Sequence, residues 1–134
     1  MERRLLRLLW VAAIVQIAGR ALDLRWHATH DEFEATSQQF EAHWLLWIGL
    51  VAVLAVAAVA VRRVPDSTSA PGFRLTLAAS LIYVPTAVWH FIEHANHNDP
   101  EVAHVFLAIW EIAILTGVVL ATVQRLRAQR ASPA

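Results

Sequence analysis

The sequence predicts an all-α fold, a bundle of four transmembrane helices. Hydrophobic residues make up 57% of the chain. The mean hydropathy of +0.47 is high for a soluble domain and typical of a multi-pass membrane protein. Residues 44–61 are apolar throughout, which is long enough to cross most of a roughly 30 Å hydrocarbon layer as a helix. These observations place the chain in a bilayer.

Four hydrophobic segments leave little of the 134-residue chain for a soluble domain. The spans are expected at residues 5–27, 43–62, 73–95 and 101–125. Arginines before the first segment would also suit a signal peptide, but no small-x-small cleavage site follows, so we interpret this segment as a retained span. The chain is therefore interpreted as a single integral membrane domain over residues 1–134.

The formal net charge of zero hides a sharp asymmetry along the chain. All basic residues are arginine, and most of them flank the predicted helix ends on one side: Arg3, Arg4, Arg7, Arg62, Arg63, Arg74, Arg125, Arg127 and Arg130. Short basic segments stay in the cytoplasm, so both termini are predicted to be cytoplasmic in a multi-pass cell-membrane protein. The opposite, extracytoplasmic side carries acidic residues and nearly all of the histidines, and it would attract cations.

The histidines gather around the first and third connections between spans. A Trp-His pair at 26–27 is followed by His43 at the start of the next span, and a second pair at 89–90 is followed by His104. The two halves therefore read as two helical hairpins, and their similarity suggests an internal duplication.

Polar residues recur at helical spacing within the apolar segments. In the first span the steps are three or four residues, which is one face of a helix: Gln16, Arg20, Asp23, His27, His30 and Glu34. In the third span the steps are three, four or seven residues, which again is one helix face: Ser80, Tyr83, His90, His94 and His97. Ionisable groups inside a span cost roughly 2.5–3.5 kcal/mol each on insertion scales, so we expect these stripes to face the bundle interior.

Imidazole and carboxylate groups in this pattern predict a metal site near the extracytoplasmic face. Asp23-x3-His27 and His90-x3-His94 each place two donors one helical turn apart. The predicted metal-site residues are Asp23, His27, His30, His43, His90, His94, His97, His104 and Glu111. Within this set, His30 and His97 are expected to support the first ion or to ligate a second one.

Several of these residues also have a plain structural interpretation. Tryptophans beside the histidines resemble an interfacial belt, which would place the imidazoles at the headgroup level against water. Arg20 and Asp23 could neutralise each other as an i, i+3 ion pair, or Arg20 could orient a liganding carboxylate. Glu111 reads equally well as a neutral acid bonded to a neighbour, as a ligand, or as part of a proton relay.

Nitrogen and oxygen donors without sulfur fit zinc, iron or copper, and the sequence does not distinguish among them. The chain has no cysteine, so a thiolate site is excluded. The number of donors suits either one ion or two.

The segment from Asp23 to His43 resembles the copper-binding helix–loop–helix found in a membrane subunit of the particulate methane and ammonia monooxygenases. The shared features are an Asp, a His four residues later and a second His beyond an acidic loop, and Asp23, His27 and His43 fill these positions. The gap before His43 is longer here, and the histidines of the second half have no counterpart in that motif. The resemblance covers residues 23–43, under a fifth of the chain, and implies copper or a similar redox ion.

The expected function is that of a membrane metalloprotein. The sequence leaves open whether it is an enzyme, either an oxidoreductase or a hydrolase, that acts on a lipid or a small hydrophobic substrate. One alternative is electron transfer by a b-type haem held between two histidines. Another is non-enzymatic metal binding or pH sensing by clustered imidazoles. The lipid bilayer is the expected partner. The sequence does not decide whether the protein also binds a partner subunit or forms a homo-oligomer. Nucleic-acid binding is not expected, because the arginines flank the membrane and are thinly spread.

Overall fold

The computed structural model describes residues 1–29, 36–96, 98 and 101–131, and the side chains of 36–42, 94 and 101 fall outside this description. The described chain is all-helical. Its four helices are α1 (Glu2–His27), α2 (Thr36–Arg63), α3 (Ala70–Ala95) and α4 (Glu101–Ala131). The sequence prediction of an all-α protein with four helices is confirmed.

Each of the four helices is long and apolar enough to cross a membrane. Large hydrophobic side chains also cover the outside of the bundle, with Val11, Leu81 and Ile112 each more than half exposed. In water such a surface would be unfavourable, whereas in a bilayer it faces lipid. The helices therefore indicate a multi-pass membrane protein.

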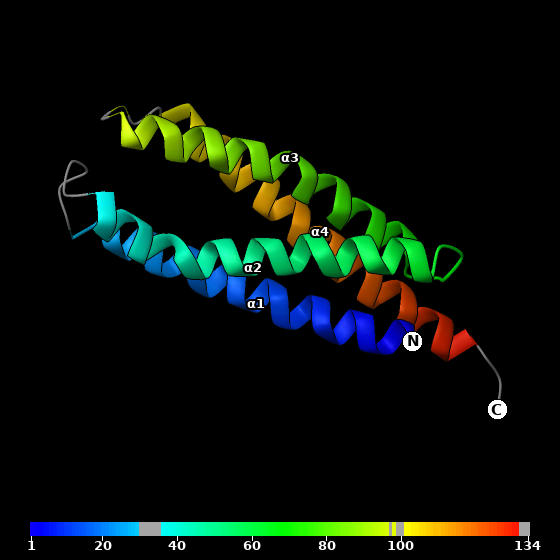
Figure 1. The fold of residues 1–134 in the computed structure, drawn as a ribbon. Coiled ribbons are helices and arrows are strands. Elements are labelled where there is room, and N and C mark those ends of the chain that lie inside the picture. The colour runs from blue at the N-terminus through cyan, green and yellow to red at the C-terminus, as the bar shows by residue number, and fades with distance from the viewer. Residues whose placement is uncertain (30–35, 97, 99–100, 132–134) are drawn as a thin grey trace.

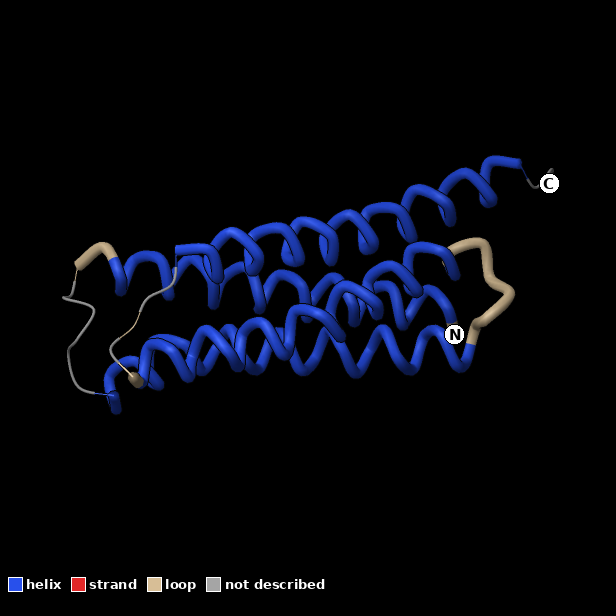
Figure 2. The backbone as a smooth tube through the Cα atoms, turned by 90° about the horizontal axis from the view of Figure 1, so that it is seen from above, coloured by secondary structure: helices blue, strands red, loops and turns tan. Residues whose placement is uncertain are grey.

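The helices lie side by side as two pairs (Figure 1). The interfaces of α1 with α2 and of α3 with α4 are the most extensive, and the interface of α1 with α4 is the smallest. Figure 2 shows the α2–α3 connection at the same end of the bundle as the N-terminus and the end of α4. The histidines of α1, α2, α3 and α4 consequently all belong to the opposite end. The cytoplasmic location of the termini and the internal duplication stay predictions.

Glycines allow close approach within each pair. A Cβ atom on Gly19 of α1 would collide with the backbone of Leu46 in α2, and one on Gly49 would collide with Gln16. In the other pair, Gly72 and Gly117 occupy equivalent contacts between α3 and α4. Small residues at helix crossings are typical of membrane bundles, because they let backbones meet closely. The Gly19 contact lies one helical turn before Asp23, so it also determines how near α2 comes to that carboxylate.

Polar contacts tie the helices together at the end that holds the N-terminus. The Glu2 carboxylate lies 2.9 Å from Arg125 of α4 and accepts a 2.5 Å hydrogen bond from the hydroxyl of Ser69. Ser69 also contacts the Ala121 carbonyl at 2.9 Å, and Trp10 Nε1 donates to Thr122 at 2.9 Å. These contacts link α1 to α4 at the end away from the histidines, although the two helices share only a small interface.

The Gly19 contact generates a stability prediction. The substitution Gly19→Val should lower the free energy of unfolding by roughly 1–3 kcal/mol, because its side chain must push α1 and α2 apart. Thermal unfolding of the detergent-solubilised protein, followed by tryptophan fluorescence, measures this. Ala21→Val, at an exposed position of the same helix, is the matched control. Equal midpoints for both variants would mean that the α1–α2 contact is not close.

Candidate metal centre

The carboxylate of Asp23 is the centre of the polar cluster. Asp23 lies one helical turn before the end of α1, and its side chain is only 1% exposed. A charged carboxylate in such surroundings requires compensating partners. It has three: Arg20 on one oxygen, and His27 and His43 on the other.

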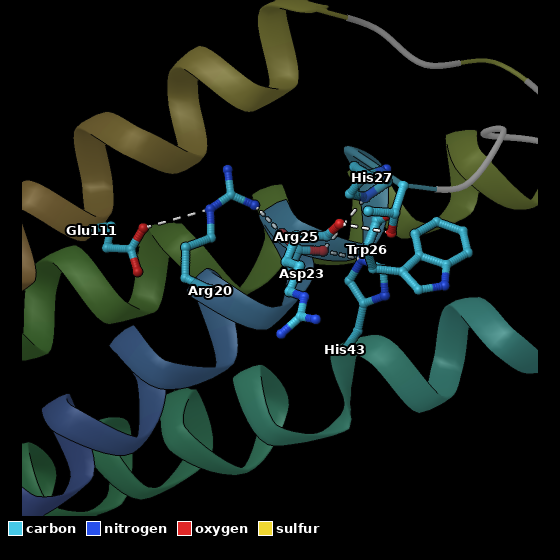
Figure 3. Close-up of polar contacts among 8 residues, drawn as sticks. Arg20, Asp23, Arg25, Trp26, His27, His43 and Glu111 are labelled. Atoms are coloured by element: carbon cyan, nitrogen blue, oxygen red, sulfur yellow. Dashed lines mark hydrogen bonds and ion pairs between the residues drawn. The ribbon is translucent and has the colours of Figure 1, made fainter.

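The two histidines approach Asp23 from different helices. His27 Nε2, on α1, lies 3.4 Å from Asp23 Oδ1, and His43 Nε2, on α2, lies 2.5 Å from the same oxygen (Figure 3). Asp23, His27 and His43 each offer one ligand atom, and these atoms all lie within 4.8 Å of one another. Asp23 and His43 are buried and His27 is half-buried. Among the described residues this trio is the group whose geometry could hold a metal ion.

Arg20 connects the trio to Glu111. The guanidinium contacts Asp23 Oδ2, and its Nε lies 3.8 Å from Glu111 Oε2 on α4. Figure 3 shows Arg20 between the two carboxylates, with Glu111 on the side away from the histidines. Arg20 therefore fixes the oxygen of Asp23 that does not face the histidines. Glu111 belongs to the wider polar network and lies outside the trio.

The second helical pair brings its own imidazoles to the same end. The rings of His90 on α3 and His104 on α4 meet edge to face, with centroids 4.4 Å apart. His104 also approaches His27, with a centroid separation of 6.1 Å, and His27 lies 5.6 Å from His43. The four rings thus form a continuous series across all four helices.

Trp26 closes one side of the trio. Its ring meets that of His27 at a centroid distance of 5.0 Å and that of His43 at 6.3 Å, both edge to face. Such contacts restrict imidazole rotation and keep the ligand atoms oriented. The tryptophan that the sequence suggests as part of an interfacial belt therefore packs directly against two predicted ligands.

A small cavity of about 20 Å³ adjoins the trio. Its walls come from all four helices: Arg20, Asp23, His43, Leu46, Trp47, Tyr83, Ala87, His90, Phe91 and Leu107. A space of this size holds about one water molecule. The cavity is mostly apolar, and the polar side chains in its wall are Arg20, Asp23, His43, Tyr83 and His90.

The structure gathers five of the nine predicted site residues at the histidine end: Asp23, His27, His43, His90 and His104. Glu111 lies beyond Arg20. His30 and His97 fall outside the described residues, as does the side chain of His94. Tyr83 and Trp47 are not among the predicted site residues, yet they line the cavity. The position of Tyr83 in the polar stripe of its helix is the sequence feature that could have indicated its place in the site. No such feature marks Trp47.

The Arg20–Asp23 pair generates a second prediction. In metal-free protein, Asp23→Ala should lower the free energy of unfolding by roughly 3–5 kcal/mol, because a largely buried guanidinium loses its nearest carboxylate. The double variant Arg20→Met/Asp23→Leu should be less destabilised than Asp23→Ala, since it removes the guanidinium together with its nearest carboxylate and leaves Glu111, which a bound proton can neutralise. Chemical denaturation in detergent, with Asp66→Ala in the exposed α2–α3 connection as control, measures both. A double variant no more stable than Asp23→Ala would contradict the pairing.

Comparisons of the chain with protein-family models, with curated proteins and with solved structures gave no match. The functional argument therefore depends on the geometry of Asp23, His27 and His43 and on the residues around them.

Proposed function

We propose that this protein is an integral membrane metalloprotein that holds a transition-metal ion on Asp23, His27 and His43. The observation that carries the proposal is the convergence of one oxygen and two imidazole nitrogens within 4.8 Å, at a largely buried position. These ligands come from two helices held together by the Gly19 contact.

The separations between ligand atoms suit a four-coordinate ion. Zinc binds nitrogen and carboxylate oxygen at about 2.0–2.2 Å, which for tetrahedral angles puts neighbouring ligand atoms about 3.3 Å apart. His27 Nε2 and Asp23 Oδ1 are 3.4 Å apart. His43 Nε2 lies closer, at 2.5 Å, so it would withdraw by less than an ångström, roughly, to admit the ion.

The composition of the cluster favours a metal site over a simple ion pair. Arg20 alone would balance the charge of Asp23, yet two imidazoles also point at its second oxygen. Arg20 in this arrangement acts like the outer partners that orient liganding carboxylates in metalloproteins. A cation of higher charge than a proton would explain why two imidazoles approach the carboxylate oxygen that Arg20 does not contact.

The burial of the ligands supports a resident ion. Asp23 and His43 are each less than a tenth exposed. Capture and handover of metal to a partner would need accessible ligands, and this site has few. The donors suit copper, zinc or iron. With zinc the bound ion would support hydrolysis, and with copper or iron it would support redox chemistry on a lipid or small hydrophobic substrate. The arginine distribution supports an extracytoplasmic location for the site.

The contact between His90 and His104 argues against a haem held by that pair. Two axial histidines hold a haem by standing on opposite faces of the macrocycle, which must lie between them. Rings in edge-to-face contact with a centroid distance of 4.4 Å leave no space for it.

The experiment that tests the proposal is elemental analysis of the protein purified in mild detergent. About one transition-metal ion per chain is expected in the wild type, and Asp23→Asn and His43→Ala should each lose most of it, because each variant removes one of three protein ligands. Two variants are the matched controls. Glu93→Gln changes a carboxylate that accepts a hydrogen bond from Asn98 and lies outside the trio. Trp44→Ala changes the exposed residue that follows His43.

Wild-type protein without bound metal, even after incubation with copper, zinc and iron, would overturn the proposal. Metal that both ligand variants retain at the wild-type level would overturn the assignment of the ligands.

A further inference from the structure

The small cavity beside the trio has two metal-ligand residues in its wall. Asp23 and His43 line it, together with Tyr83, His90 and the apolar side chains of Trp47 and Phe91. An ion bound to Asp23 and His43 would therefore border this space. With three protein ligands, a four-coordinate ion keeps one position for an exchangeable ligand.

Tyr83 is the residue of the cavity wall that carries a hydroxyl group. Tyr83 is fully buried, and its hydroxyl makes no well-formed hydrogen bond within the described part of the chain. Gln16 lies next to it, also buried, and its amide atoms likewise lack a well-formed hydrogen bond among the described residues. Buried hydroxyl groups in folded proteins are nearly always bonded to protein or to ordered water. A molecule in the cavity, which Tyr83 lines, would complete the hydrogen bonding of this hydroxyl, whose polar neighbour is Gln16.

The volume restricts what that molecule can be. About 20 Å³ accommodates a single water molecule, and no organic substrate fits without movement of the walls. Apolar neighbours such as Leu46 and Leu107 offer no hydrogen bonds, so a bound water needs the metal on one side and a polar group on the other. A phenol meets this need, because it both donates and accepts hydrogen bonds.

We propose that the cavity holds the exchangeable ligand of the metal ion, a water molecule, and that the Tyr83 hydroxyl hydrogen-bonds to it. The inference rests on the proposed metal site and adds its open coordination position. It makes Tyr83 the positioning residue for whatever small ligand replaces that water. A small anion entering the same position would accept a hydrogen bond from Tyr83.

The test uses the full-length protein loaded with Co²⁺, whose visible absorption reports its ligands, and azide as the probe. Wild-type protein should bind one Co²⁺ and change its spectrum as azide replaces water. Tyr83→Phe should keep the cobalt but bind azide about tenfold more weakly, the effect of one lost hydrogen bond. Ala87→Leu, which fills the cavity, should keep the cobalt and lose azide binding. Ala108→Leu, at an exposed position of α4, should behave as wild type.

The two proposals fail in different ways. Wild-type protein that binds no Co²⁺ lacks the metal site, and both proposals are then wrong. If the cobalt-loaded variants Tyr83→Phe and Ala87→Leu bind azide as the wild type does, the metal site is still supported. The open coordination position then lies outside this cavity, and the further inference is wrong. Cobalt content close to wild type is the check that each variant is folded.

Discussion

The whole architecture depends on one buried negative charge, the carboxylate of Asp23. A carboxylate at 1% exposure among apolar helices is stable only with strong partners on both oxygens. Arg20 occupies one oxygen from the same helix, and the second oxygen draws His27 and, across the helix interface, His43. The missing side chain of Gly19 lets α2 come close enough for that last contact. The position of the carboxylate thus links backbone packing to ligand geometry.

The two ends of the bundle have different roles. At the end that holds the N-terminus, Glu2, Ser69 and Arg125 join α1 to the other helical pair through short polar contacts. At the histidine end the pairs meet through rings instead, with His104 between His27 and His90. Fixing the far end leaves the histidine end as the place where imidazoles from both pairs converge. An ion held there would reinforce the α1–α2 interface, since binding to the folded state alone adds to its stability.

Much of the fold could be predicted because membrane burial imposes simple rules on sequence. Apolar length predicts the four helices, and helical spacing correctly predicts that Gln16, Asp23 and His90 are buried. Spacing within one helix cannot predict contacts between helices, which depend on rotation and on close approach. The pairing of His43 with Asp23 and the link from Glu111 to Arg20 therefore required the structure. So did the cavity, whose apolar walls at Trp47 and Phe91 carry no chemical signal in the sequence.

X-ray absorption spectroscopy of the metal-loaded protein tests the central claim most directly, because it reports the atoms bound to the ion. The account predicts nitrogen and oxygen neighbours at about 2.0–2.2 Å, with the more distant scattering of two imidazole rings. Oxygen neighbours alone, without imidazole scattering, would contradict it.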